Sequence, residues 1–507
     1  MEVKKNTHNI ILIALLVLVA IIIFREHYFP NQISYNLYES ISAQYLNSVG
    51  VFLQKNIQDV GFNAYLNGID SLESEVYSNF PVFHMFFGAM LVKSGFLNYS
   101  FNSFQVVTGV AMIVTYVLLI LTVIKVSKNK TSALILSSLV LSNNFLIDSY
   151  NDLWWEPYFL FFIISQIYCI VSRKWVFLYV LAFLQFFFNY DSAVYGFTFL
   201  VGYVFIHKID ELPRRMGPIL EYLWRNNFEV VIKYFTISCI SFFLTATIKN
   251  IYSAEIPDIE VVLLNMYSIS MEDLYRFFNY YIFSPYMVSA ITFLVLMRKF
   301  FNYKFISLIV WSLVWLMIFP AHGLHHSYHY SKILLIVLYF LISIIISNSD
   351  KHVFYISILV AINLFTGYYL YKTENLDYSS YQYAIPYIED SAIVISNHVS
   401  YPMTYYIKRS AIIKDVNEVK SECLFDSAIV INDFPQVAVG ATTIYRAFTK
   451  INDLLGGYLP DLSIYVKRKN KFIKYRDKFT LNLLKCGGKV VYTDPLLRYS
   501  IYNKGVL

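Results

Sequence analysis

Long apolar runs recur along the first three quarters of this chain, and they constrain its fold more than any other feature. A membrane-spanning helix needs about 20 consecutive, mostly apolar residues, and eleven segments come near that length. Their ranges are 10–25, 104–126, 131–148, 154–172, 174–189, 191–207, 229–248, 284–298, 304–321, 330–347 and 352–371. Only 15% of the 507 residues are charged, whereas soluble domains average about 25%. The sequence therefore predicts an all-α polytopic membrane bundle of about 11 transmembrane helices.

Two apolar segments need a separate interpretation. The first run follows the polar start MEVKKNTHN, and no small-residue cleavage site lies before its polar flank. We interpret it as a retained transmembrane anchor rather than a cleaved signal peptide. The stretch at 80–96 is short, and His84 and Lys93 interrupt it. We expect it to form a juxtamembrane or re-entrant helix that does not cross the bilayer.

Basic residues in the short loops predict the orientation. Short loops rich in lysine and arginine stay in the cytoplasm, and here they lie at 125–130, 172–174, 207–216, 297–304 and 348–352. They alternate with less basic loops, and all share one side with the N-terminal lysines if 80–96 does not cross. We therefore expect a multi-pass protein of the bacterial inner membrane, with its N terminus in the cytoplasm and its C terminus in the periplasm. We assign the net charge of +6 to this topology and not to nucleic-acid binding.

The same reading divides the chain into two domains. Residues 1–371 form the bundle, including a long outer loop at 26–103, and residues 372–507 are more polar. Short β-branched runs at 391–396, 427–432 and 488–493 alternate with helix-like patterns there, which predicts a small α/β periplasmic domain. Both cysteines of this region, Cys423 and Cys486, could pair in an oxidising periplasm, but the sequence does not show whether they are close.

Ionisable residues near a membrane core are candidates for function, and many lie on the predicted outer side. They are Arg25, Glu26, Glu39, Lys55, Asp59, Asp148, Asp152, Glu156, Asp191, Glu255, Asp258, Glu272, Asp273, Arg276, His322, His325, His326, His329 and Lys332. Taken singly, such a loop residue is more often solvated than functional. We expect no metal at the four histidines, because adjacent His325 and His326 would point apart on a helix. Together, acids, bases and cations at one end of a bundle indicate chemistry on a lipid-borne substrate.

The order of features along the chain carries a specific resemblance. An N-terminal span precedes a long outer loop with an acid, YNLYESISAQYLNSVG, and this loop ends in YSNFPVFHMFFGAML. Then come DSYNDLWWEPYFLFFIISQIY, FLYVLAFLQFFFNYDSAVYG and, late in the bundle, HHSYHYSKILLIVLYFL. This layout resembles the GT-C superfamily of integral-membrane glycosyltransferases, in the group of aminoarabinose transferases and protein mannosyltransferases. ESISAQYL matches the family's first-loop pattern at Glu39, Ala43 and Leu46, but the usual tandem Asp-Glu and the late Lys-Arg are absent.

The resemblance implies an activity. A GT-C enzyme of this group would move a sugar from a polyprenyl-phosphate donor to an acceptor at the periplasmic face, with inversion. We expect no organic cofactor, and the sequence leaves a divalent metal ion open. A phosphate leaving group needs no protonation, so one general base suffices; we expect Glu39 in this role, with Glu26 second. Arg276, Lys332 and Arg25 are the candidates for the donor phosphate. Asp148, Asp152, His329 and Tyr330 are the expected substrate-binding residues.

The sequence also suggests an acceptor, and two alternative functions stay open. The chain's size, its richness in Ile, Phe, Tyr and Asn, and its outward C-terminal domain also resemble serotype-converting O-antigen glucosyltransferases. A hexose such as glucose and a surface polysaccharide are then the expected sugar and acceptor. A transporter or flippase of lipid-linked sugars is the first alternative, although no internal repeat of the kind seen in transporters is present. A polymerase or ligase of the same glycan pathway, with a diphosphate-linked donor, is the second.

Overall fold

The computed structural model describes most of the chain, and its contacts divide the chain into two compact units. The described ranges are 37–56, 83–147, 155–206, 228–252, 284–297, 303–347, 352–371, 378–389, 401–407, 416–432, 464–495 and 498–504, with short pieces between them. Unit 1 comprises residues 1–29, 78–84 and 104–371, and unit 2 comprises residues 30–77, 85–103 and 372–507. The second unit thus combines the 372–507 region with most of the loop at 26–103. The first predicted span, 10–25, lies outside the described residues.

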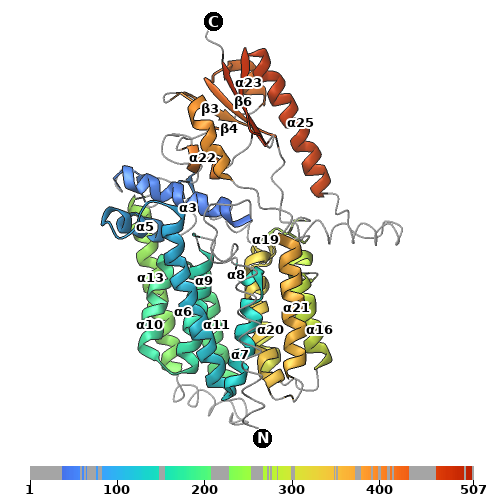
Figure 1. The fold of residues 1–507 in the computed structure, drawn as a ribbon. Coiled ribbons are helices and arrows are strands. Elements are labelled where there is room, and N and C mark those ends of the chain that lie inside the picture. The colour runs from blue at the N-terminus through green and yellow to red at the C-terminus, as the bar shows by residue number, and fades with distance from the viewer. Residues whose placement is uncertain are drawn as a thin grey trace. The chain divides into compact units, whose positions relative to one another are not determined.

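Unit 1 is a bundle of apolar helices that run side by side (Figure 1). Its elements are α6 (Phe101–Ser127), α7 (Lys130–Leu141), α8 (Asn144–Ile147), α9 (Glu156–Val171), α10 (Trp175–Leu184), η2 (Gln185–Phe187), α11 (Asp191–Ile206), α13 (Glu229–Tyr252), η5 (Phe278–Ile282), α16 (Pro285–Leu296), α17 (Tyr303–Ser312), α18 (Val314–Ile318), α19 (Pro320–His325), α20 (Ser327–Ser347) and α21 (His352–Tyr371). Prolines at the first turns of α9, α16 and α19 suit helix starts, where no intrahelical donor is lost.

The helices agree with the predicted spans in position more closely than in length. Three of the described helices, at 101–127, 229–248 and 327–347, are long and apolar enough to cross a membrane. Several others are apolar but shorter, such as α7 and α9. The predicted span at 304–321 is divided into α17, α18 and the start of α19, because the helix is interrupted after Ser312 and again after Ile318. The stretch at 80–96 forms the 11-residue helix α5 (Phe83–Lys93).

Buried polar side chains connect the helices of unit 1. Tyr339 on α20 accepts a hydrogen bond from Asn143 Nδ2 at 2.8 Å and donates one to Asn363 Oδ1 at 2.9 Å. Asn363 in turn donates to the carbonyl oxygen of Leu139 at 3.2 Å, so one network connects α7, α20 and α21. A polar side chain inside an apolar bundle is stabilised only when its hydrogen bonds are satisfied. These hydrogen bonds therefore help to determine which faces of α7, α20 and α21 pack against one another.

Unit 2 contains a five-stranded mixed sheet with the strand order β4-β3-β5-β7-β6. The strands are β3 (Val394–Ser396), β4 (Ile412–Ile413), β5 (Ser427–Ile431), β6 (Gly488–Thr493) and β7 (Tyr499–Lys504). β3 pairs in parallel with β4 and β5, whereas β7 pairs antiparallel with β5 and β6. The three predicted strands are confirmed as β3, β5 and β6. β4 and β7 were not predicted, because β4 is two residues long and β7 carries polar residues at Ser500 and Asn503.

Helices cover both faces of this sheet. On one face, Ala428, Val430 and Tyr502 pack with Phe479 and Leu483 of α25 (Ile464–Lys485). That face also receives α23 (Val416–Glu422), which packs against α25. On the other face, Tyr499 meets Tyr381 of the 3₁₀ helix η7 (Tyr378–Tyr387), with ring centroids 4.7 Å apart. The remaining elements are α22 (Tyr401–Ile407), α3 (Leu37–Gln54), which packs against α22, and the short pair β1 (Ala64–Tyr65) and β2 (Val76–Tyr77).

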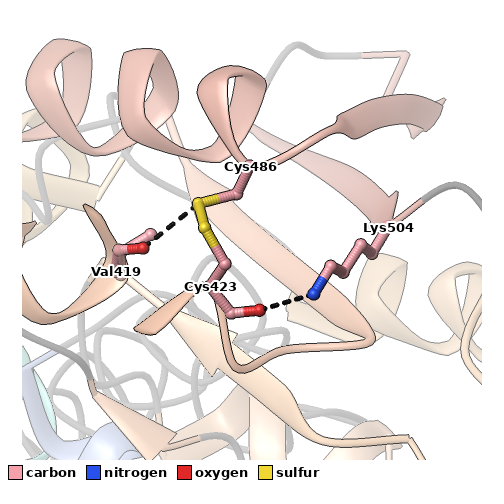
Figure 2. The surroundings of a disulfide bond; sticks show 4 residues. All are labelled: Val419, Cys423, Cys486 and Lys504. Carbon is pink, nitrogen blue, oxygen red and sulfur yellow. Dashed lines mark hydrogen bonds between the residues drawn. A yellow bond between two sulfur atoms is a disulfide. The ribbon is translucent and has the colours of Figure 1, made fainter. Parts of the chain in front are cut away.

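A disulfide joins the ends of the two helices on the first face. Cys423 follows α23, Cys486 follows α25, and their Cα atoms are 5.5 Å apart (Figure 2). Lys504 Nζ donates a hydrogen bond to the carbonyl oxygen of Cys423 at 2.8 Å. The pairing that the sequence left open is therefore present. It closes a loop of about 60 residues, and a cross-link of that span stabilises a fold by about 2–4 kcal/mol.

Candidate functional site

A buried charged cluster lies where α9, α11 and α20 begin. It consists of Glu156, Asp191, His329, Tyr330 and Lys332, which are between 0% and 7% exposed. Lys332 Nζ is 2.9 Å from Glu156 Oε1 and 3.0 Å from Oε2, so one ammonium group contacts both carboxylate oxygens. His329 Nδ1 is 3.2 Å from Glu156 Oε1, and Tyr330 donates a hydrogen bond to Asp191 Oδ2 at 2.9 Å. Side-chain contacts thus join the first turns of three helices.

Aromatic rings enclose the cation of this cluster. Lys332 Nζ lies 4.8 Å from the ring centroid of Tyr328 and 5.1 Å from that of Phe145. Trp155 packs against His329 with centroids 4.5 Å apart. An ammonium group over aromatic faces gains electrostatic attraction, and more of it where water is excluded. The lysine is therefore held by one carboxylate and two rings in a dry environment.

The geometry of the cluster determines what it can do chemically. A carboxylate that accepts from His329 Nδ1 favours the tautomer with its proton on that nitrogen, which leaves Nε2 as the acceptor while the ring is neutral. The starts of α9, α11 and α20 also contribute partial positive charge, because helix N-termini carry unsatisfied N–H groups. The cluster therefore combines acids, a cation and a helix-end field that favours anions. Such a site suits the recognition of a phosphate and the movement of a proton.

A second acid–histidine pair belongs to the same unit. His325 Nδ1 lies 3.0 Å from Asp273 Oδ1, and Ser270 donates to Asp273 Oδ2 through its backbone N–H at 2.9 Å and its hydroxyl at 2.5 Å. Burial alone would raise the pKa of Asp273, but the bonds from Ser270 and His325 lower it below its ordinary value. The ring of His326 contacts that of His322 in a tilted arrangement and that of His325 edge-on, at 4.5 Å and 4.9 Å between ring centroids. Among the described residues, no group of three or more His, Cys, Asp or Glu side chains could hold a metal ion.

An apolar cavity of about 270 Å³ lies between five helices of unit 1. On α20 its lining begins at Ile333, the residue after Lys332, and on α9 it begins at Leu160, one turn after Glu156. The lining continues to Val171 at the end of α9 and to Lys304 at the start of α17. The other lining residues are Leu119, Thr122, Val126, Ile163, Ile164, Ile167, Thr198, Phe199, Gly202, Tyr203, Ser307, Leu308, Trp311, Ile336, Val337 and Phe340. Along α9 and α20, the apolar lining therefore starts within about one turn of the charged cluster and continues toward the opposite helix ends.

The structure brings together three of the residues proposed from sequence. His329, Tyr330 and Lys332 are all in the buried charged cluster. Glu39 lies in the first turn of α3, but its side chain lies outside the described residues, as do Glu26, Arg25, Arg276, Asp148 and Asp152. Their predicted roles therefore stay predictions. The sequence also did not single out Glu156 and Asp191 among the outer acids, although each begins a long apolar helix, which is a signal for a buried acid.

Comparison with solved structures identifies similar folds. ArnT from Cupriavidus metallidurans bound to undecaprenyl phosphate aligns with a TM-score of 0.58 over 97% of this chain and 98% of that chain, at 10% sequence identity. The apo state of that protein aligns with a TM-score of 0.54 over 97% of each chain, also at 10% identity. No protein-family model and no curated protein matches the sequence. The fold is thus similar to that of ArnT along almost the whole chain, and three of the described helices are long and apolar enough to cross a membrane.

Proposed function

We propose that this protein is an inverting glycosyltransferase that moves a sugar from a polyprenyl-phosphate donor to a surface polysaccharide. The observation that carries the proposal is the buried charged cluster of Glu156, Lys332 and His329 on a fold shared with ArnT along almost the whole chain. ArnT was solved with undecaprenyl phosphate, which is a polyprenyl phosphate. The cluster supplies a cation and helix N-termini, and both favour a phosphate group.

The donor's two chemical parts match two features of unit 1. The phosphate would lie at the helix ends beside Lys332, and the isoprenoid tail would occupy the apolar cavity that begins one residue further along α20. Burying an apolar chain is favourable at roughly 25 cal/mol per Å². Arg276 and Arg25 stay candidates for additional phosphate contacts.

The transfer step needs one proton acceptor. The acceptor hydroxyl would attack C1 of the donor sugar, the C1–O bond to the phosphate would break, and the lipid phosphate would leave with the bonding electrons. Glu39, with Glu26 as second candidate, would take the hydroxyl proton. Lys332 would offset the charge that develops on the phosphate. Asp148, Asp152, His329 and Tyr330 would orient the sugars.

Glu156 also has a role in this proposal, because its carboxylate contacts the ammonium group of Lys332. Two of the three N–H donors of Lys332 point to the two oxygens of Glu156. A phosphate would therefore compete with Glu156 or share the cation with it. Glu156 is best described as a positioning residue, which holds Lys332 and His329 at the helix ends while the donor is absent.

The finer assignment is a serotype-converting hexosyltransferase, with glucose as the sugar and O-antigen as the acceptor, at the periplasmic face of the bacterial inner membrane. Deletion of the gene tests it. Loss of one side-branch sugar with an intact polysaccharide backbone is the expected result. Loss of the whole polymer would instead support a polymerase or a flippase.

A reconstituted reaction tests the donor class. The purified chain should transfer labelled hexose from a polyprenyl monophosphate to isolated polysaccharide, and should not use the diphosphate-linked sugar. Arg276→Ala and Lys332→Ala should weaken apparent donor affinity more than acceptor affinity. Equal use of both donors would contradict the proposal, and unchanged donor affinity in both variants would remove these two cations from the phosphate site.

A further inference from the structure

Helix α25 of unit 2 has an unusual concentration of positive charge. Its 22 residues include eight lysines and arginines and one acidic residue, Asp477, so its net charge of +7 exceeds the +6 of the entire chain. The packing of α25 on the sheet does not use this charge, because it is made from the opposite face of the helix by Phe479 and Leu483. The transfer chemistry proposed above does not use it either.

Four lysines of α25 form a single line along its exposed side. Lys471, Lys474, Lys478 and Lys485 are all exposed, and with 3.6 residues per turn they fall within a sector of about 60°. The line is about 21 Å long at a rise of 1.5 Å per residue. We call these four residues the lysine stripe. Their spacing presents a row of cations and not a single pocket.

The cations of the lysine stripe are not neutralised within the described part of the chain. Arg476 is the basic residue that pairs with Asp477, at 2.8 Å, and it also donates to the carbonyl oxygen of Asn432 at 2.8 Å. None of the four lysines forms an ion pair with a described acidic residue, and the neighbour of Lys478 Nζ is the neutral Asn417 Oδ1 at 3.4 Å. The disulfide between Cys423 and Cys486 anchors the adjacent end of α25, so the stripe belongs to a fixed helix (Figure 2).

We propose that the lysine stripe binds an anionic polysaccharide, as a docking site for the acceptor. A row of cations complements a linear polymer that carries carboxylates or phosphates at regular intervals. Helices that bind membranes instead insert a continuous apolar face into the lipid interface. On α25, Phe479 and Leu483 pack on the sheet, and among its described side chains only Leu481 and Leu484 are large, apolar and exposed. The identification of this polysaccharide as the acceptor rests on the proposed function. The inference adds that the polysaccharide carries negative charge and that unit 2 recognises it.

A binding measurement tests the inference without any transfer chemistry. The full-length chain, in nanodiscs of zwitterionic lipid, is titrated with polygalacturonate, which has one carboxylate per sugar, and with neutral dextran of similar length. We expect binding of polygalacturonate alone, weakened at high salt because exposed charges are screened. Replacement of all four stripe lysines by serine should reduce the affinity about tenfold or more, since each exposed ion pair contributes modestly.

A matched variant controls for net charge. Lys55, Lys93, Lys420 and Lys489 are exposed lysines of unit 2 that lie outside α25, and their replacement by serine removes the same charge. This control should bind polygalacturonate almost as tightly as the unmodified chain. Both variants should keep the disulfide and elute as the unmodified chain does in size exclusion.

Three outcomes would overturn the inference. One is equal binding by the stripe variant and the control, and another is equal binding of polygalacturonate and dextran. The third is protection of the stripe lysines from an aqueous acylating reagent in nanodiscs that contain phosphatidylglycerol, without any glycan, since the stripe would then face the membrane. A failure of the proposed transferase function is distinguishable, because the reconstituted chain would then transfer no hexose from the polyprenyl monophosphate, whereas polygalacturonate binding is measured separately.

Discussion

Glu39 is the residue on which the proposed chemistry depends most. A positioned general base contributes about 10²–10⁴-fold to a rate, and Glu39→Gln keeps the size of the side chain but removes its proton acceptor. We expect a loss of transfer in that range at normal expression. Ser40→Ala, one position along, is the control and should have little effect. Near-full transfer by Glu39→Gln in membranes would shift the role to Glu26, Asp148 or Asp152.

The contact between Glu156 and Lys332 predicts strong coupling between the two residues. Both side chains are fully buried, and removal of one partner of a buried ion pair costs about 3–5 kcal/mol, because the other charge stays unpaired. Glu156→Gln and Lys332→Met should therefore each lower the thermal stability in detergent. The double variant should be more stable than either single variant. Additive losses would show that the two charges are independent of each other.

His322 predicts a dependence of stability on pH. Burial, and to a smaller extent the nearby His325 and His329, lowers the pKa of His322 to about 4. An unfolded histidine titrates near 6.5, so between about pH 6.5 and pH 4 the unfolded state binds more protons, and stability falls as the pH is lowered. Through this residue we expect a loss of about 1–2 kcal/mol at pH 5. His322→Gln should reduce the dependence of the melting temperature on pH over this range. An unchanged pH dependence would mean that other groups cause it.

At the scale of elements, close helix packing depends on Gly196 of α11. A Cβ atom there would lie 1.8 Å from Gln166 Oε1 and 2.6 Å from the Tyr234 hydroxyl. These two side chains hydrogen-bond to each other, and Gln166 Nε2 donates to Gln185 Oε1 at 3.0 Å. The glycine therefore makes room for a buried network that joins α9, η2 and α13.

Two glycines of one helix provide the test. Overpacking a core costs about 1–3 kcal/mol, so Gly196→Ala should lower the melting temperature clearly. Gly202→Ala is the control, because no atom lies within 4 Å of a Cβ at that position and alanine favours the helix. Equal melting temperatures for the two variants would mean that the network moves aside without cost.

At the scale of the whole molecule, the alternation of basic loops predicts the orientation in the membrane. Alkaline phosphatase folds only where disulfides form, so a fusion after residue 400 should be active and one after residue 212 inactive. The disulfide of unit 2 agrees with an oxidising compartment for that unit. An inactive fusion at residue 400 would overturn the predicted arrangement of eleven crossings.

The sequence by itself determined the features that depend on local composition. Apolar runs placed α6, α9, α11 and α20 within a few residues of their observed bounds, because a helix in lipid requires a continuous apolar stretch. β-branched runs likewise located β3, β5 and β6. The order of apolar and basic segments also predicts an outer position for His329, Tyr330 and Lys332, which stays a prediction.

Only the tertiary structure decided which distant residues meet. Glu156 and Lys332 are 176 positions apart, Asp191 and Tyr330 are 139 apart, and Cys423 and Cys486 are 63 apart. The grouping of 30–77 with 372–507 and the free side of the lysine stripe also depend on long-range packing. The physical reason is that a run of residues specifies its own helix or strand, whereas the pairing of charges depends on which helix faces pack together, and many distant residues determine that together.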